Sequence, residues 1–185
     1  MRCAGGIREY GASMSIRAIV SIIILMTFLG FGGKASALQP GDEAPRITAT
    51  DQNGQPLDFG KIYDSGITLV YFYPKADTPG CTAQACSLRD SIQDLSPDKI
   101  RILGVSRDTP EAQKKFQEKY KLPFPLIADK EGKVAAAFGV PGTMGLPISS
   151  RQSFLVKDGK IVWVSLKAQT STHAAEVKAA LESLK

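Results

Sequence analysis

The sequence predicts an α/β fold in which helices flank a central mixed β-sheet. From Leu38 onward, strand patterns alternate with helix patterns, which is typical of layered folds built on one sheet. Residues 67–73 (ITLVYFY) are almost wholly apolar, as expected of a strand that is covered on both faces. An antiparallel hairpin at residues 151–165 makes the predicted sheet mixed.

The first elements are a small hairpin, the core strand and a helix. Residues 46–59 (RITATDQNGQPLDF) predict the hairpin, because Asn53-Gly54 favours a tight turn between strands. After the core strand, Thr78 and Pro79 predict a helix start, since threonine is a favoured N-cap and proline fits the first helical position. Three apolar residues then follow at helical spacing: Leu88, Ile92 and Leu95.

The middle of the chain continues the alternation. Residues 99–106 (KIRILGVS) predict a second core strand, and a second Thr-Pro pair, residues 109–110, predicts the start of another helix. One face of that helix carries Ala112, Phe116 and Tyr120. Residues 124–129 predict a third strand, and residues 132–139 predict a short helix that ends at Gly139.

The carboxyl-terminal part begins with a loop rich in glycine and proline, residues 140–150. The hairpin that follows turns at Asp158-Gly159. Ser171 or Thr172 then caps a last helix. This helix points three apolar residues inward: Val177, Leu181 and Leu184. We find no internal repeat and no low-complexity segment.

The first 37 residues have the composition of a secretory signal peptide. Arg17 precedes an apolar core, residues 18–31, and the small residues 35–37 (ASA) end the segment. The core is shorter than the roughly 20 residues that a membrane-spanning helix needs. We therefore expect cleavage after Ala37 and export to a periplasm or a thylakoid lumen; an uncleaved membrane anchor is the alternative. Met14 is an alternative start, because a signal peptide needs nothing that precedes it.

The charge of the chain argues against one broad class of function. The chain has 23 basic and 18 acidic residues, a formal net charge of +5. Without the four basic residues and one acidic residue of the first 37, the rest carries 19 and 17, a net charge of +2. It has no basic cluster, so we expect no nucleic-acid partner. Residues 38–185 fit one domain with its own core.

Two cysteines, Cys81 and Cys86, remain in this domain and admit three interpretations: a disulfide, a metal site or a reactive thiol. A disulfide between them closes a very short loop and contributes little to stability. Cys81 falls in the first turn of the helix that starts at Pro79, where free amide groups and the helix dipole favour an anion. This position favours a reactive Cys81, and a buried structural cysteine is the alternative.

The spacing of the two cysteines narrows these interpretations. C-x-x-x-x-C differs from the C-x-x-C of thioredoxin-type disulfide carriers, and a structural zinc site needs four ligands. The single histidine, His173, lies near the start of the last helix. We expect it to be a surface or capping residue rather than a metal ligand.

The stretch YFYPKADTPGCTAQACSLRD, residues 71–90, resembles the active-site segment of the peroxiredoxins, specifically the Q type, also called bacterioferritin comigratory protein. The P-x-x-x-T-x-x-C pattern of that family is met by Pro74, Thr78 and Cys81. Its resolving cysteine, five residues further on, is met by Cys86. This segment is highly specific to the family.

The resemblance extends over nearly all of residues 39–184. Arg151 matches the distant arginine that opens a strand after a long loop in the family, and the segments KLPFPLIAD and AAAFGV are also similar. One position differs: many relatives have a glutamate where this chain has Gln84. Glutamine can hold the arginine by a hydrogen bond only, so this supporting contact needs to be tested in the structure.

The resemblance implies a thioredoxin-like fold and the reduction of hydrogen peroxide or organic hydroperoxides, without a metal or organic cofactor. Cys81 would be the peroxidatic residue and become a sulfenic acid, and Cys86 would resolve it as a disulfide. Thioredoxin or another dithiol would restore both thiols. Thr78 and Arg151 would donate hydrogen bonds to the peroxide, and Pro74 would limit water in the pocket. We expect an antioxidant monomer that acts in redox homeostasis and is not bound to the membrane.

Each of these residues also has a plain structural interpretation. Thr78 can be an N-cap only, Pro74 can end the strand, and Arg151 can be a surface arginine. Two rival classes of protein also remain at this point. One is a thiol–disulfide carrier or metal-delivery protein on the same fold, and the other is a module with a static disulfide.

Helical geometry makes the spacing of the cysteines informative. Projected at 100° per residue, Cys81, Ala85, Leu88, Ile92 and Leu95 share one inward stripe, and Cys86 falls on another face. Cα atoms five residues apart in a helix are about 8.6 Å apart, whereas a disulfide needs roughly 4.4–6.8 Å. We therefore expect a helical reduced form whose turn between the cysteines unwinds on oxidation.

Overall fold

The structure, a computed structural model, describes residues 36–91, 100–143 and 146–184. The predicted signal peptide, apart from its last two residues, and the helix positions Ile92 and Leu95 lie outside the described residues. The helices in the described part are all too short or too polar to cross a bilayer.

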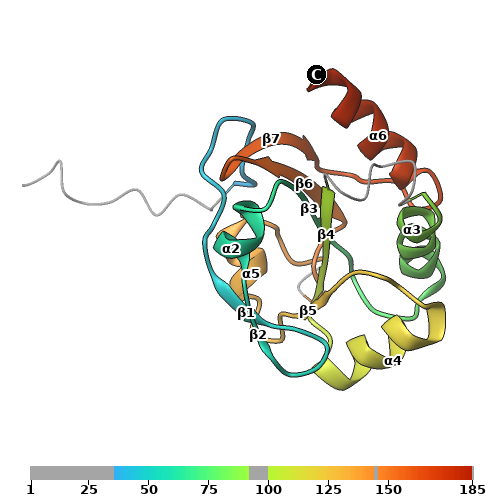
Figure 1. Cartoon of the computed structure of the whole chain (residues 1–185). Coiled ribbons are helices and arrows are strands. Elements are labelled where there is room, and N and C mark those ends of the chain that lie inside the picture. Colours follow the sequence, from blue (N-terminus) through green and yellow to red (C-terminus); the bar gives the residue numbers. More distant parts are fainter. Residues whose placement is uncertain (1–35, 92–99, 144–145, 185) are drawn as a thin grey trace, which may run out of the picture. The chain divides into compact units, whose positions relative to one another are not determined.

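A mixed sheet of five strands forms the centre of the described part of the chain (Figure 1). In spatial order the strands are β5 (Leu126–Ala128), β4 (Ile100–Ser106), β3 (Ile67–Phe72), β6 (Gln152–Lys157) and β7 (Lys160–Ser165). β3 pairs in parallel with β4 and antiparallel with β6, which confirms the predicted α/β fold with a mixed central sheet. A separate small hairpin consists of β1 (Thr48–Thr50) and β2 (Pro56–Asp58).

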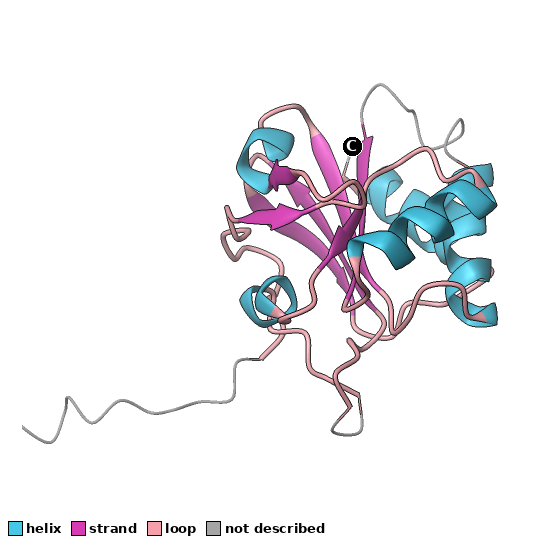
Figure 2. Cartoon of the chain, turned by 90° about the horizontal axis from the view of Figure 1, so that it is seen from below, coloured by secondary structure: helices cyan, strands magenta, loops and turns pink. Residues whose placement is uncertain are grey.

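Helices cover both faces of the five-stranded sheet (Figures 1 and 2). They are α2 (Phe59–Tyr63), α3 (Pro79–Asp90), α4 (Pro110–Tyr120), α5 (Lys133–Ala137) and α6 (His173–Ser183). Side chains of β3 alternate between the faces. Leu69 and Tyr71 pack with residues of α3, α4 and α6, whereas Val70 and Phe72 pack with residues of α2 and α5. This double coverage explains why β3 is apolar at nearly every position.

Both predicted hairpins form, and each turns where its dipeptide predicts. In the first, the Asp51 carboxylate accepts hydrogen bonds from the backbone N–H groups of Asn53 and Gln55, both at 2.8 Å. In the second, between β6 and β7, Asp158 and Gly159 have φ angles of 53° and 77°. Two consecutive positive φ angles are what a two-residue turn between twisted strands requires.

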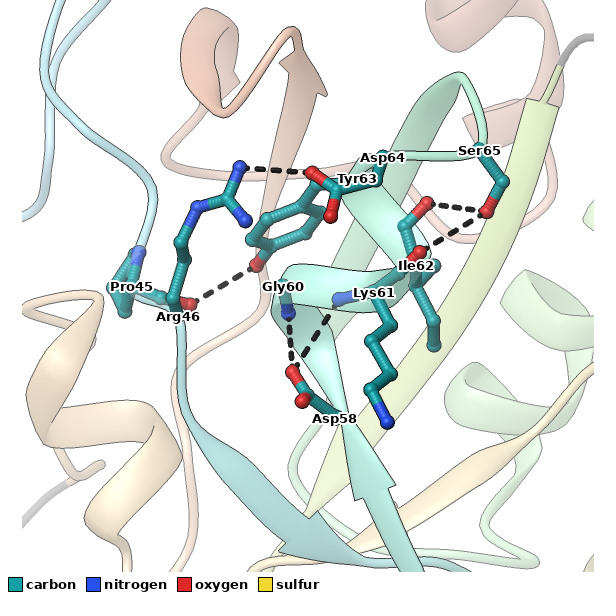
Figure 3. A network of polar contacts seen from close by, with 9 residues as sticks. All are labelled: Pro45, Arg46, Asp58, Gly60, Lys61, Ile62, Tyr63, Asp64 and Ser65. Carbon is teal, nitrogen blue, oxygen red and sulfur yellow. Dashed lines mark hydrogen bonds and ion pairs between the residues drawn. The ribbon is translucent and has the colours of Figure 1, made fainter.

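No helix is predicted between the first hairpin and β3, yet α2 forms there (Figure 3). Asp58 caps it, because its Oδ1 accepts hydrogen bonds from the N–H groups of Gly60 at 2.8 Å and Lys61 at 3.3 Å. The Tyr63 hydroxyl donates to the carbonyl of Pro45 at 3.4 Å. A helix of five residues is too short for an apolar repeat to appear in the sequence. Its N-cap residue, Asp58, was therefore the only local signal for it.

The predicted helix starts are correct in position, but only one predicted cap forms. The Thr109 hydroxyl oxygen accepts a hydrogen bond from the Ala112 N–H at 3.3 Å and so caps α4. Thr78 and Thr172 occupy the N-cap positions of α3 and α6, but neither side chain hydrogen-bonds to the helix amides. The prediction of side-chain caps on these two helices is therefore wrong.

The predicted inner face of α4 needs one correction. Phe116 is fully buried, as expected, but Ala112 and Tyr120 are only half-buried. The other fully buried residue of α4 is Gln113, whose amide nitrogen donates to the carbonyl of Ile127 at 2.9 Å. A polar side chain is tolerated in the core here because its hydrogen bonds are satisfied.

Candidate active site

The loop between β3 and α3 places the first cysteine, and neighbouring elements fix this loop. The Ala76 N–H donates to a carboxylate oxygen of Asp108 at 2.7 Å. Asp77 has a left-handed φ of 58°, and its carboxylate accepts hydrogen bonds from Lys119 at 2.8 Å and from the Tyr120 hydroxyl at 2.7 Å. The bond to Lys119, then that to Tyr120, lowers the pKa of Asp77. The turn into α3 is therefore anchored to α4 and to the loop before it.

Cys81 lies in the first turn of α3, as predicted, and is almost fully buried, with 2% of its surface exposed. Ala85 and Leu88, on the same stripe of the helix, are fully buried beneath it. The predicted inward stripe is thus confirmed as far as Leu88. The sulfur of Cys81 is a free thiol that faces the domain rather than solvent.

Arg151 reaches Cys81 because of the sheet topology. β6 runs antiparallel to β3 and pairs Gln152 with Phe72, so the residue before β6 lies at the end of β3, beside the loop into α3. From there Arg151 Nη2 donates a hydrogen bond to Cys81 Sγ at 3.4 Å. Gly80 lies beside the guanidinium, and a Cβ on Gly80 would make an ordinary van der Waals contact with Nη2 at 3.4 Å.

Gln84 holds the same guanidinium from behind. It is fully buried one turn after Cys81, and its Oε1 accepts a short hydrogen bond from Arg151 Nη1. The supporting contact that the sequence left open for a glutamine is therefore present. Arg151 therefore has two hydrogen bonds, one to Gln84 and one to Cys81. Together they fix the plane of its guanidinium, which a single charge contact would leave free to rotate.

His173 is fully buried, so the expectation of a surface or capping histidine is wrong. Its Nδ1 lies 3.1 Å from Gln84 Nε2, and its Nε2 lies 2.9 Å from the hydroxyl of Ser153 on β6. Burial first, and then the charge of Arg151, lower the pKa of His173 to about 4. His173 thus joins α6 to α3 and β6 as a neutral side chain at pH 7.

The sequence contained a signal for His173 that the prediction did not use. His173 lies four residues before Val177, which was predicted to point inward and is fully buried. Helical periodicity places both on one face. Leu181 and Leu184, also predicted to point inward, are partly buried against the same core. A similar signal existed for Ser153, because in the period of two of a strand it shares a face with the buried Leu155.

The two remaining candidates, Thr78 and Pro74, belong to the loop between β3 and α3. Thr78 is half-buried, and its hydroxyl donates to the carbonyl of Lys75 at 3.0 Å. Pro74 is half-buried directly after the end of the core strand. Neither has a hydrogen bond to Cys81 or Arg151 within the described part of the chain. For Thr78 to donate to a bound molecule, its hydroxyl must rotate away from Lys75.

Cys86 lies on the same continuous helix and is half-buried, and its thiol is free. Unbroken helix from Pro79 to Asp90 confirms the helical reduced form that the cysteine spacing predicts. In this geometry the Cα atoms of the two cysteines are about 8.6 Å apart, which is too far for a disulfide.

Comparison with known proteins agrees with this arrangement. The model of the AhpC/TSA family matches residues 40–164. Peroxiredoxin Bcp of Escherichia coli strain K12 is 42% identical over 142 residues, which cover 74% of this chain and 90% of that protein. The chloroplastic peroxiredoxin Q of Sedum lineare is 37% identical over 147 residues, 78% of each chain. The crystal structure of peroxidoxin BcpB from Mycobacterium tuberculosis has a TM-score of 0.74 at 33% identity and covers 80% of this chain and 99% of that one.

Proposed function

We propose a specific reaction from the premise that the chain belongs to the AhpC/TSA family and is a peroxiredoxin of the Q/Bcp type, a thiol peroxidase. In this proposal, it reduces hydrogen peroxide and organic hydroperoxides with Cys81 as the peroxidatic residue. Cys86 resolves the oxidised Cys81 as a disulfide. One observation carries the proposal. A buried thiol in the first turn of a helix accepts a hydrogen bond from Arg151, at 3.4 Å.

In the first step, the Cys81 thiolate attacks one peroxide oxygen and the O–O bond breaks. A sulfenic acid forms on Cys81, and the leaving oxygen takes a proton and departs as water or an alcohol. Negative charge develops on that oxygen in the transition state. Arg151 donates from a planar, permanently charged group. The first turn of α3, which has no side-chain cap, adds the positive end of the helix dipole. Thr78 adds a hydroxyl after rotating away from Lys75, and Pro74 presents a wall without an N–H.

In the second step, the Cys86 thiolate attacks the sulfenic sulfur and a disulfide forms, while the sulfenic hydroxyl takes a proton and leaves as water. The intact helix holds the two cysteines too far apart for this bond, so at least the turn from Cys81 to Cys86 must unwind. This unwinding has a cost, because it exposes the buried side chains of Cys81, Gln84 and Ala85. It also breaks the hydrogen bonds of Gln84 to Arg151 and His173. A thioredoxin or similar dithiol then reduces the disulfide by thiol–disulfide exchange, and no metal or organic cofactor takes part.

We also propose that residues 1–37 are a cleaved signal peptide and that the domain works as a monomer in a periplasm or a thylakoid lumen. The composition of the segment supports this. The Leu38 N–H donates to the Phe138 carbonyl at 3.1 Å, and a chain that begins at Leu38 keeps this bond. The intact mass of the exported protein tests the cleavage site, and a full-length product held in the membrane would contradict it.

A stopped-flow assay of the reduced protein with hydrogen peroxide tests the chemistry. Cys81→Ser is expected to lose nearly all activity, whereas Cys86→Ser is expected to consume about one equivalent of peroxide and stop as a trappable sulfenic acid. Lys114→Ala, at an exposed position of α4, is the control and should leave the rate unchanged. Retained activity in Cys81→Ser, together with loss of the first turnover in Cys86→Ser, would reverse the two roles.

A further inference from the structure

A hydrogen-bonded network of fully buried polar side chains extends from Arg151 into the core. Gln84 accepts from Arg151 Nη1 with its Oε1, and its Nε2 lies 3.1 Å from His173 Nδ1. His173 Nε2 lies 2.9 Å from the hydroxyl of Ser153. Gln84, His173 and Ser153 have no exposed surface. Their hydrogen bonds therefore join α3, α6 and β6 behind the guanidinium.

Donor and acceptor rules fix the direction of each hydrogen bond in this network of four side chains. A guanidinium has donors only, so the atom of Gln84 that faces Arg151 must be the amide oxygen. The NH₂ group of Gln84 then faces His173, and only a ring nitrogen with a free lone pair can accept from it. Nδ1 of His173 must therefore be unprotonated. The ring proton sits on Nε2 and is donated to the hydroxyl oxygen of Ser153.

We propose that His173, as the neutral Nε2–H tautomer, is a positioning residue that holds the amide of Gln84 with its oxygen toward Arg151; this rests on the proposed function, in which Arg151 acts on peroxide. A glutamine amide rotated by 180° occupies nearly the same space. In that orientation its NH₂ group meets the guanidinium, donor against donor, and the guanidinium loses its support. The lone pair on His173 Nδ1 favours the productive orientation over the rotated one.

The surroundings of His173 keep it in the required state. The ring of Tyr71 on β3 packs against it edge to face, with ring centroids 6.0 Å apart. Arg151 is the charged group whose field acts on it, and on α6 itself Glu176 follows one turn later, its carboxylate accepting from the Gln169 N–H at 3.4 Å. Burial and the Arg151 charge lower the pKa of His173 to about 4, so the lone pair on Nδ1 is available at pH 7.

Two substitutions of His173 separate positioning from packing. His173→Leu keeps apolar volume but removes the acceptor, and we expect it to slow the reaction with peroxide roughly 10- to 100-fold. His173→Asn places an amide oxygen near the position of Nδ1 and should stay within about threefold of wild type by the same argument. Val177→Ala, one turn along the same buried face, is the matched control. It loosens α6 without touching Gln84 and should leave the peroxide rate unchanged.

A change at Gln84 provides a rescue test. A carboxylate presents an oxygen to Arg151 in either orientation, so Gln84→Glu removes the need to orient the side chain. His173→Leu should therefore cost much less in the Gln84→Glu background than alone, which is strong non-additivity between residues in contact. Equal losses in both backgrounds, or a Val177→Ala variant as slow as His173→Leu, would overturn the proposal.

A nitrogen NMR measurement reads the tautomer without any activity. The chain has a single histidine, so the untagged protein labelled with ¹⁵N-histidine shows one pair of ring nitrogens. We expect Nε2 protonated and Nδ1 bare in the wild type, and the proton on Nδ1 in Gln84→Glu, where the carboxylate needs a donor. A wild-type ring protonated on Nδ1 would overturn the proposal even if Cys81 is peroxidatic. A correct tautomer in a protein without peroxidase activity would instead contradict only the proposed function.

Discussion

Helices α3 and α4 begin with the same Thr-Pro pair and pack against the same core cluster, yet their first turns are held differently. In α4, the Thr109 hydroxyl oxygen accepts from the Ala112 N–H at 3.3 Å. In α3, the Thr78 hydroxyl donates to the Lys75 carbonyl instead and leaves the helix amides without a side-chain cap. The same local sequence thus gives one closed helix start and one open one.

The second position of each helix extends this contrast. In α4 it is Glu111, an acidic residue in the first turn, whose pKa is lowered by hydrogen bonds with Thr109 and its own backbone. In α3 it is Gly80, and the first turn has no acidic residue. The positive end of α4 is therefore matched by its own side chains, whereas that of α3 is left for the sulfur of Cys81 and for a peroxide. We infer that the first turn of α4 stays helical, whereas the first turns of α3 hold the reactive thiol and unwind on oxidation.

The largest expected effect is on amide hydrogen exchange. On oxidation to the Cys81–Cys86 disulfide, confirmed by mass, amides of residues 82–88 should lose roughly 100-fold or more in protection, because the turn unwinds. The Ala174 N–H, which donates to Ser87 at 3.2 Å, should lose protection with them. Amides of α4 serve as the internal control and should change little. Equal protection of α3 in both states would contradict the unwinding.

Arg151→Lys tests how fast Cys81 reacts with peroxide when the start of α3 lacks the arginine. Lysine keeps the charge but lacks the planar fork that contacts Cys81 and Gln84 together, so we expect the peroxide step to slow about 100-fold. Reduction of the disulfide by a dithiol should change little. Second-order rates with peroxide that match the wild type would mean that the α3 amides suffice.

The contrast between the two helices also shows what sequence can and cannot predict. Both Thr-Pro pairs predict a helix start correctly, because proline and threonine act through local geometry. Whether the threonine hydroxyl turns to its helix or to Lys75 depends on the loop before it, and no local pattern encodes that. The sheet and its turns were predictable for the same local reasons, since apolar runs and Asn-Gly or Asp-Gly pairs are short-range signals.

The site was predictable only in part. A reactive Cys81 was predicted from its position at a helix start. Arg151 was found only through a resemblance, because it reaches Cys81 across 70 positions through the pairing of β6 with β3. The burial of Gln113 was missed, and His173 was wrongly expected at the surface or at a helix cap, because both residues are polar. A pattern of apolar positions does not reveal that a polar side chain is buried when its hydrogen-bond partners come from distant elements.

The caps provide a matched pair of smaller effects. Thr109→Ala removes a side-chain cap and should lower the free energy of unfolding by about 1 kcal/mol, with the peroxide rate unchanged. Thr78→Ala removes no cap, and we expect it to affect the peroxide rate more than stability. Chemical denaturation and stopped-flow rates on both variants measure this. A larger loss of stability in Thr78→Ala than in Thr109→Ala would show that its bond to Lys75 matters more to the fold than a cap does.

The smallest expected effect comes from making the start of α3 stiffer. A methyl group at Gly80 fits, because it would contact Arg151 Nη2 at 3.4 Å and a methyl of Thr170 at 3.5 Å, both ordinary van der Waals distances. Gly80→Ala should stabilise the helical turn by about 0.5 kcal/mol, since alanine loses less conformational freedom than glycine on becoming helical. Unwinding, and with it disulfide formation, should slow about twofold.

The first step should be untouched in this variant, because Cys81 reacts from the helical form. Sulfenic acid then persists longer, and at high peroxide a larger fraction of Gly80→Ala should end as sulfinic acid, detected as added oxygen by intact mass. Lys114→Ala, at an exposed position of α4, is the control for a substitution that favours helix elsewhere. If Gly80→Ala formed the disulfide at the wild-type rate with an unchanged peroxide step, opening of the first turn would not limit resolution. The difference between α3 and α4 would then concern the reactivity of Cys81 alone.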